Sequence, residues 1–527
     1  MSRTDRAAKG FVAALFQQFS QIMVQVLLAP LVLKMAGRET LGAYAAIMQA
    51  LALLAMVDVA GSWSLDRFLA QATGVEDGGQ RFREVFTTAR TVLLITNCFF
   101  AIVVTVFSFF IGRMFHLTPG IARDARYALY VIAVWAIVKT PFAAYQNASV
   151  ANQDIAAINM IATVLNVGRS IASLLFVLAG AGLFGLMLAG TVVEACGSFL
   201  YRWRFKRHYP NLMPKWGVPS RSLLREMLSF GGFTMVMNVG NRLFLSSANL
   251  LAGLTNGAVA ASSFYTSQMP ALTGFNLLYR LTESSQPAVH EIYGRRDLER
   301  LRRAFMRLVR LMLMLTLPLA VGVFLFNQDL VTSWVGPKLY AGPLLTDTLA
   351  IYVAISALQG LAILFSFVFG WVRLLAVTSL LQGAANVGVG YYLGKTMGLG
   401  GITLALVVVL MPQLIILLTK LSRALRVNAA LMIAASLMRG VVPIVLAALA
   451  GLLVHAHVHV ARHRFSGLLE EAFVYCAVYA VGAYLLVMHA EDRADTRRML
   501  GRILHRGRSL QKLFRAISWP DNLRRSK

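Results

Sequence analysis

The side chains best suited to bind a ligand in this sequence are cations that interrupt long apolar runs. Four of them stand inside or at the ends of such runs: Arg242, Arg169, Lys139 and Arg280. A charge within a membrane-spanning helix costs at least about 2.5 kcal/mol, so it normally faces a partner or a cavity. Because arginine forks pair well with phosphate oxygens, these cations predict a site for an anion such as a phosphate or pyrophosphate.

Amide side chains accompany the cations at helical spacing. Asn238 and Asn249 share one predicted helical face with Arg242, and Asn276 stands about one turn before Arg280. A central cavity would house these groups together. The predicted polar lining of that cavity is Gln21, Asn238, Asn249 and Asn276.

Acidic groups are fewer in the apolar runs. Asp58 and Glu194 are predicted to bind a coupling ion, either a proton or sodium, and Glu283 follows Arg280 by three positions. The cations therefore outnumber the acids by one, which favours an anionic cargo.

Structural explanations stand beside this functional one. Arg280 and Glu283 lie close to a predicted helix end, where they could reach the lipid headgroups without any role in binding. Lys139 and Asp58 could form an internal salt bridge. The remaining two cations could instead make hydrogen bonds between helices.

Other kinds of chemistry have weaker signals. The cysteines Cys98, Cys196 and Cys476 stand alone in apolar runs, so we interpret them as packing residues. A histidine run follows a later apolar segment, where it could bind zinc or form a solvated, pH-responsive loop; its members are His455, His457, His459 and His463. No GxxxxGK[ST] motif is present. We expect no metal, no cofactor and no enzymatic activity.

The composition predicts that these groups sit in a membrane protein. The chain has 527 residues, of which 58% are hydrophobic and only 14% charged, and its mean hydropathy is +0.66. Apolar runs of about 20 residues, the length that crosses a bilayer, recur along most of the chain. We predict an all-α polytopic membrane protein with about fourteen transmembrane helices, the first two over 10–33 and 41–63.

The distribution of charge predicts the orientation. If the N-terminus is cytoplasmic, lysine and arginine are about four times as frequent on the cytoplasmic side. Both termini are therefore placed in the cytoplasm. The net charge of +27 then fits anionic membrane lipids as partners and needs no nucleic acid.

An internal repeat organises the predicted helices. At a shift of about 220 residues, RFREVFTTAR (81–90) lies opposite LRRAFMRLVR (301–310). Six helices in each unit predict two parallel lobes with a central cavity between them, followed by two extra C-terminal helices. The predicted divisions are an N-lobe (1–206, helices 1–6), a C-lobe (207–426, helices 7–12), helices 13 and 14 (427–490) and a basic amphipathic cytoplasmic tail (491–527).

Three segments resemble a known family. Residues 36–71 contain a Gly-x-Tyr, an Asp-x-x-Gly and a late arginine, and residues 145–190 and 286–310 match further family patterns in the same order. On these segments the chain resembles polysaccharide-transport flippases of the multidrug, oligosaccharidyl-lipid and polysaccharide export superfamily. The resemblance implies two six-helix lobes around a V-shaped cavity, alternating access and a bacterial inner-membrane location.

The cargo implied by the resemblance is an undecaprenyl-pyrophosphate-linked oligosaccharide used for O-antigen, capsule or exopolysaccharide synthesis. Its implied partners are this lipid-linked oligosaccharide and, further along the pathway, a polysaccharide polymerase and co-polymerase. An ion-coupled multidrug antiporter of the same superfamily is the main alternative, although organic cations would prefer an acidic cavity. A membrane polysaccharide polymerase is a third reading, which the short predicted external loops disfavour.

Overall fold

The computed structural model describes residues 3–56, 68–69, 71–73, 79–152, 154–214, 219–224, 232–457, 465–488 and 493, with side chains from residue 26 onward apart from a few positions. Every regular element in this described part is a helix, as the hydropathy pattern predicts. The N-terminal group comprises α1 (Arg3–Leu54), α3 (Gln80–Met114), α4 (Pro119–Val138), α5 (Thr140–Ala143), α6 (Tyr145–Ala151), α7 (Ile155–Leu178) and α8 (Gly182–His208). The C-terminal group comprises α10 (Gly232–Leu245), α11 (Ala248–Gly294), α12 (Leu298–Val335), α13 (Pro343–Val368), α14 (Val372–Met397) and α15 (Leu399–Leu425).

Two glycines bend the longest helices at equivalent places. Gly37 breaks α1 with φ 85° and ψ 173°, and Gly257 breaks α11 with φ 80° and ψ 169°. Positive φ is strained for residues with a Cβ, so glycine is the residue that permits this turn between two spans. The two turns lie 220 positions apart, at the shift that the basic segments predict.

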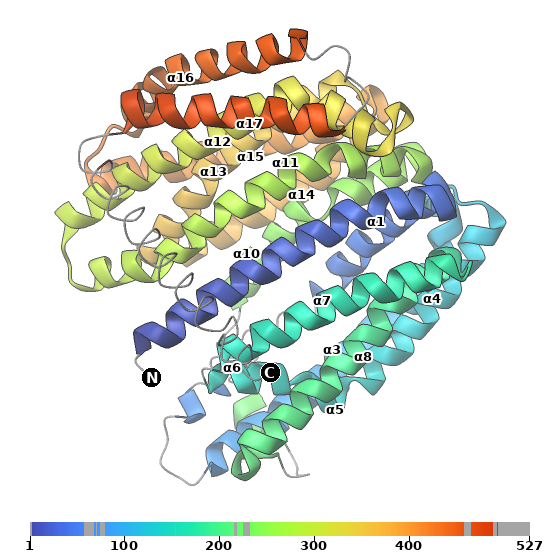
Figure 1. Ribbon diagram of the computed structural model, residues 1–527. Helices are drawn as coiled ribbons and strands as arrows, with labels where there is room; N and C mark the ends of the chain where they lie inside the picture. Colours follow the sequence, from blue (N-terminus) through green and yellow to red (C-terminus); the bar gives the residue numbers. More distant parts are fainter. Residues whose placement is uncertain are drawn as a thin grey trace, which may run out of the picture. The chain divides into compact units, whose positions relative to one another are not determined.

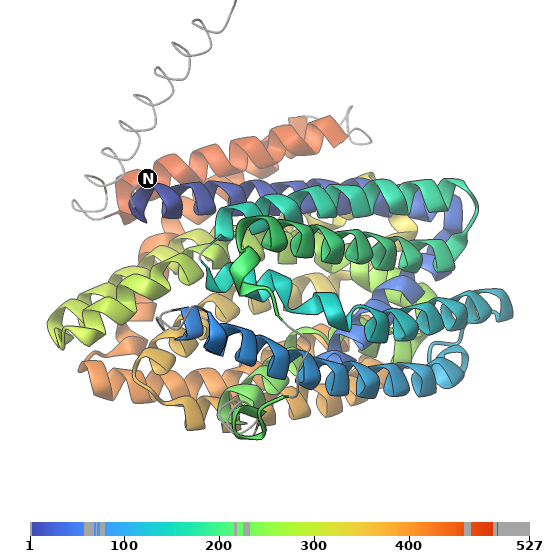
Figure 2. The same cartoon turned by 90° about the horizontal axis from the view of Figure 1, so that it is seen from below.

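The packing of helices also repeats. The pairs α1 with α7, α3 with α4, and α7 with α8 correspond to α10 with α14, α12 with α13, and α14 with α15. These neighbours run side by side in Figures 1 and 2. The first group forms the N-lobe and the second the C-lobe, and α1 packs along α11 where the lobes meet. Two parallel lobes of the predicted kind are therefore present.

The number of spans agrees with the sequence-based expectation. Ten helices in the described part are long and apolar enough to cross a membrane, or eleven if α4 and the segment after it, bent by 50°, form one span. One of these runs, from Val236 to Gly294, contains the turn at Gly257 and so holds two spans. The helix α1, which is broken at Gly37, is not included in this count, and the total is roughly consistent with the predicted fourteen.

Apolar side chains point both into the lobes and out of them. On α3, the side chains of Ile95, Phe99, Ile102 and Val106 are exposed along one flank, and only 33% of its most apolar window is buried. In α13, by contrast, 72% of the residues in its most apolar 18-residue stretch are buried, so α13 forms the interior of the C-lobe. An exposed apolar flank of this length suits contact with lipid.

The two C-terminal helices form a separate compact unit. The first unit holds Met1–Ala429 with His463–Phe465, and the second holds Ala430–Arg462 and Ser466–Lys527. In the second, α16 (Ala429–His457) is joined to α17 (Phe465–Gly482) by a contact of 3.2 Å between His455 Nδ1 and Glu471 Oε2. The predicted amphipathic tail, apart from Arg493, lies outside the described residues.

Candidate functional site

A cavity of about 320 Å³ lies on the N-lobe side of the contact between the lobes. Helices α1, α7 and α8 supply most of its wall, and α11 closes it from the C-lobe. Polar and aromatic groups on its wall are Tyr44, Gln49, Asn166, Arg169, Ser170, Ser173, Asn249 and Tyr265. None of the described residues that line the cavity is acidic. The cavity therefore combines a positive charge with neutral hydrogen-bonding groups.

Arg169 supplies that charge from the middle of α7. Its Nη2 donates to Tyr44 Oη over 3.4 Å, a long hydrogen bond. The guanidinium lies against Gly190 of α8, where a Cβ would come within 3.1 Å of Nη2. Gly190 thus leaves the space that the flat guanidinium occupies. Because the tyrosine hydroxyl satisfies only part of the donor fork, Arg169 keeps donors available for an anionic ligand.

A break in the seventh predicted span brings backbone donors to the same cavity. The helix is interrupted at Ser246 and Ser247, so the first N–H groups of α11 have no partners within the helix. Gln49 Oε1 accepts from the backbone N–H of Asn249 at 2.7 Å and of Leu250 at 3.3 Å. An acceptor from the N-lobe therefore caps the positive end of a C-lobe helix.

The Asn249 side chain is held from its own lobe. It is 4% exposed, and its Oδ1 accepts a hydrogen bond of 2.6 Å from Gln268 Nε2. Asn249 lies on the wall of this cavity, and its role in lining a transport site stays a prediction.

Arg242 and Asn238 lie on α10, before the break. Arg242 is exposed and Asn238 half-buried. Within the described residues, the Arg242 side chain has no hydrogen bond or ion pair. Opposite them on the helix, Gly240 and Phe244 pack into the C-lobe, so the Arg242 face points away from that core.

Two other predicted cations are paired with acids. Lys139 Nζ lies 3.0 Å from Glu194 Oε1, and Arg280 Nη1 lies 2.9 Å from Glu283 Oε2 on a surface where both side chains are about half exposed. Lys139 thus pairs with Glu194, the group predicted to bind a coupling ion. Asn276 is exposed on α11, one turn before Arg280.

Two predicted positions have no described side chain. Asp58 lies outside the described residues, and so does the side chain of Gln21, whose backbone belongs to α1. Of the histidine run, His455 contacts Glu471, and His459 and His463 lie outside the described residues. Among the described residues no group of three metal-ligating side chains is found.

Neutral polar side chains of α13, α14 and α15 form a network in the interior of the C-lobe. Gln359 Nε2 donates to Gln382 Oε1 over 3.0 Å and to Gln413 Oε1, and Gln413 Nε2 donates to the Ser379 hydroxyl over 3.0 Å. Asn386 Nδ2 donates to Ser247 Oγ over 2.8 Å, across the break between α10 and α11. In the sequence these residues are visible only as single amides within apolar runs. The hydrogen bonds between them, which make them a network, are visible only in the structure.

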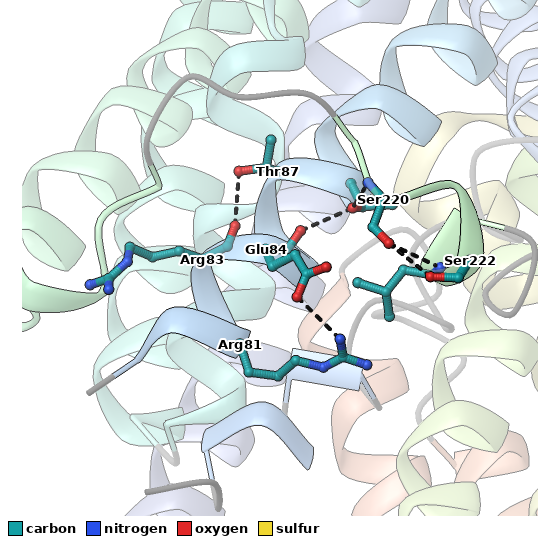
Figure 3. A network of polar contacts seen from close by, with 8 residues as sticks. Arg81, Arg83, Glu84, Thr87, Ser220 and Ser222 are labelled. Carbon is teal, nitrogen blue, oxygen red and sulfur yellow. Dashed lines mark hydrogen bonds and ion pairs between the residues drawn. The ribbon is translucent and has the colours of Figure 1, made fainter. Parts of the chain in front are cut away.

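The connection between the lobes is anchored to the N-lobe. Figure 3 shows Ser220 turned toward α3, where its backbone N–H donates to Thr88 Oγ1 over 3.2 Å. Nearby, Arg83 Nη1 donates to the carbonyl of Asn211 over 2.7 Å. Arg81 and Glu84 form an exposed pair on the same helix (Figure 3). Arg83, which the repeat aligns with Arg303, therefore holds the connector.

Comparisons with known proteins agree with this architecture. A family model described as polysaccharide biosynthesis protein matches residues 13–339. The chain is 25% identical over 414 residues to "Uncharacterized membrane protein EpsK" of Bacillus subtilis (strain 168), an alignment that covers 75% of this chain and 79% of that protein.

Solved structures share the fold. An inward-facing multidrug resistance MATE family transporter of the MOP superfamily matches with a TM-score of 0.62 at 15% identity, covering 78% of this chain and 99% of that one. A MOP superfamily transporter from Pyrococcus furiosus Vc1, described as having a binding pocket of reverse polarity, matches with a TM-score of 0.56 at 14% identity, covering 80% and 95%. An outward-facing MATE family transporter matches with a TM-score of 0.55 at 15% identity, covering 79% and 95%.

Proposed function

The chain belongs to the polysaccharide biosynthesis protein family, and from this premise we propose that it is a flippase for lipid-linked oligosaccharides. It is a multi-pass membrane protein with the fold of MATE and MOP transporters. The proposed cargo is an undecaprenyl-pyrophosphate-linked oligosaccharide repeat unit, moved across the bacterial inner membrane by alternating access. The protein would act without catalysis, between the enzymes that build the repeat unit and a polymerase that joins the units.

The observation that carries the proposal is Arg169 in a cavity without an acidic partner among the described wall residues. Arg169 is half-buried, and a cation inside a membrane-spanning helix without a counterion costs free energy unless a ligand brings the opposite charge. A pyrophosphate group has that charge and oxygens that suit a guanidinium fork. A cavity built for organic cations would be expected to carry the opposite sign.

Arg242 and the start of α11 support the same cargo. The exposed Arg242 lies on α10, and the break at Ser246 and Ser247 separates it from Asn249 on the cavity wall. The helix dipole of α11 places further partial positive charge at the cavity wall. A phosphate group passing from Arg242 toward Arg169 would meet positive potential at each position, while the prenyl chain stays in lipid.

The proposed topology places both termini in the cytoplasm. In this arrangement the turns at Gly37 and Gly257 face away from the cytoplasm, and the basic starts of α3 and α12 face the cytoplasmic leaflet. The lobes are proposed to span 1–206 and 207–426, with helices 13 and 14 in 427–490 and a lipid-binding tail in 491–527. Asp58 and Glu194 stay candidates for ion coupling, and Glu194 is paired with Lys139.

The test follows the lipid-linked oligosaccharide in cells that lack this protein. They should accumulate it in the cytoplasmic leaflet, and wild type should reverse the accumulation, whereas Arg169→Gln or Arg242→Ala at equal membrane abundance should not. Gly388→Ala serves as the control, since a Cβ there meets nothing within 4 Å. Absence of accumulation together with altered tolerance to drugs would replace the flippase by a multidrug antiporter.

A further inference from the structure

A proline leaves one carbonyl of α1 without its helical partner. Pro30 lies inside α1, and proline has no backbone N–H to donate to the carbonyl four positions earlier. That carbonyl belongs to Val26. An unsatisfied carbonyl within a membrane-spanning helix is costly, so another donor is expected nearby.

The donor comes from the other lobe. Trp334, at the end of α12, donates from Nε1 to the Val26 carbonyl over 2.9 Å. The indole nitrogen of tryptophan only donates, so Trp334 needs no donor of its own at this position. The hydrogen bond joins residues 308 positions apart, from α1 of the N-lobe to α12 of the C-lobe.

Two more contacts between the lobes lie beside the turns at Gly37 and Gly257. Arg38 Nη2 donates to the carbonyl of Lys338 over 2.7 Å. The backbone N–H of Ala258 donates to the carbonyl of Phe115 over 3.2 Å. Arg38 and Ala258 each follow a turn glycine directly, and each reaches the segment just after a long helix of the opposite lobe. We call the end of the molecule that holds these contacts the glycine end.

We propose that Trp334 is a positioning residue that latches the glycine end by occupying the carbonyl which Pro30 exposes. Separating the lobes at this end must break the indole hydrogen bond and leave Val26 without a donor. The latch therefore favours the joined state and makes opening depend on the shape of α1 at its proline.

The position of the latch connects it to the cavity. Leu28, Ala29 and Val32 flank Pro30 on α1 and line the cavity wall. A ligand that displaces this wall would move the part of α1 around Pro30 and so strain the hydrogen bond between Trp334 and the Val26 carbonyl. The idea that cargo opens the latch rests on the proposed function. The hydrogen bond between Trp334 and Val26 exists in the protein without cargo and can be tested separately.

The test measures how often the glycine end is open in the full chain, reconstituted in lipid nanodiscs without cargo. Spin labels at Met35 and Met397, which are 44% and 46% exposed, report the distance between the lobes after the native cysteines are replaced by serine. We expect Trp334→Phe to raise the population with the longer distance about threefold to tenfold. Trp135→Phe is the matched control, because its buried Nε1 has no hydrogen-bond partner in the described part of the chain.

A second variant separates the hydrogen bond from the packing of the indole. Pro30→Ala restores a helical N–H for the Val26 carbonyl, and it should by itself raise the open population at least twofold. In the Pro30→Ala background, Trp334→Phe should change the population by less than twofold. An equal effect of Trp334→Phe in both backgrounds, or no effect in either, would overturn the latch. These distances require no cargo, so failure of lipid-linked oligosaccharide to accumulate in cells would count against the flippase alone.

Discussion

Two equivalent helix contacts, α1 with α7 in the N-lobe and α10 with α14 in the C-lobe, are built in opposite ways. We call each of these contacts a seam. In the N-lobe, α1 and α7 leave room for a cavity of about 320 Å³ and the guanidinium of Arg169. In the C-lobe, α10 and α14 approach until glycine is required, since a Cβ on Gly240 would meet the backbone of Ser379. One seam holds space and charge, and the other holds neither.

The difference is visible position by position. Ile155 begins α7 and Val372 begins α14, so the two helices correspond at a shift of 217. At that shift the polar cavity residues Asn166, Arg169 and Ser173 correspond to Gly383, Asn386 and Gly390. Two of three polar residues are replaced by glycines against which α10 or α11 packs, and the cation is replaced by an amide that bonds to Ser247.

The two copies of a repeat can thus keep the same fold while one contains a cavity with a cation and the other is closely packed. The C-lobe seam joins its helices backbone to backbone and satisfies its amides internally, which suits a wall that moves as one body. The contact between α1 and α7 in the N-lobe keeps donors of Arg169 available, which suits the lobe that we propose to hold a ligand. Four variants break or sharpen this contrast.

The largest effect is expected from forcing the tight seam apart. In Gly383→Ala the new Cβ would meet the carbonyl of Gly240 and lie 2.8 Å from the Cβ of Leu243. Backbone rather than a flexible side chain would have to move, so we expect a destabilisation of about 1–3 kcal/mol or more and a fall of several degrees in the unfolding temperature. Gly388→Ala on the same helix, which meets nothing within 4 Å, should leave thermal unfolding in detergent unchanged. Equal unfolding temperatures for the two variants would show that the C-lobe seam is not closely packed.

The second effect comes from giving the N-lobe seam the chemistry of the C-lobe. Arg169→Asn places the equivalent residue's amide in the cavity and removes its cation. Loss of a charged hydrogen bond to an anion costs about 1.5–3 kcal/mol, so transport should fall by about tenfold or more. Thermal stability should fall little, because the variant loses only the long hydrogen bond to Tyr44 and no acid among the described wall residues loses its partner. Arg169→Lys keeps the charge but not the guanidinium fork, so its transport rate should lie between those of wild type and Arg169→Asn. Transport by Arg169→Asn at the wild-type rate would remove the cation from the mechanism.

The sequence was sufficient for some of these features and insufficient for others. Apolar runs of membrane length predicted the helices, and the break between the first two spans falls at Gly37, because a turn between spans needs both a gap in hydropathy and a permissive backbone. The single helical face predicted for Asn238, Arg242 and Asn249 is interrupted at Ser246 and Ser247, so Asn249 lies on α11 and the other two residues lie on α10. Spacing does not show which helix packs opposite, so it could not pair Lys139 with Glu194 or bring Gln49 to the start of α11.

Close approach is equally invisible in a single sequence. Gly383 and Gly388 are both glycines of one helix, yet only the first lies against another backbone. Trp334 reads as an aromatic residue near a helix end, where indoles commonly contact lipid headgroups. Its partner is a carbonyl that only the proline of another helix makes available.

A smaller effect is expected from narrowing the space behind Arg169. In Gly190→Ala the new Cβ would lie 3.1 Å from Nη2 and 3.4 Å from Cζ of Arg169. The guanidinium is the end of a flexible side chain, so it can shift by a few tenths of an ångström at little cost in stability. We expect the concentration of cargo needed for half-maximal transport to rise about threefold while the maximal rate changes less. Gly168→Ala, on α7 in open space, is the control; the same change in both variants would mean that the placement of the guanidinium does not matter.

The smallest effect is expected at Arg280, which the sequence groups with the other cations. Its partner Glu283 lies on the same helix three positions later, and the two side chains are 52% and 48% exposed. Exposed pairs of this kind contribute about 0–1 kcal/mol, and solvent or lipid headgroups can replace either partner. Arg280→Gln should therefore leave transport within about twofold of wild type and the unfolding temperature unchanged. A loss comparable to that of Arg169→Asn would extend the site along α11 to Arg280, and the ligand would then contact the C-lobe as strongly as the N-lobe, against the contrast between the two seams.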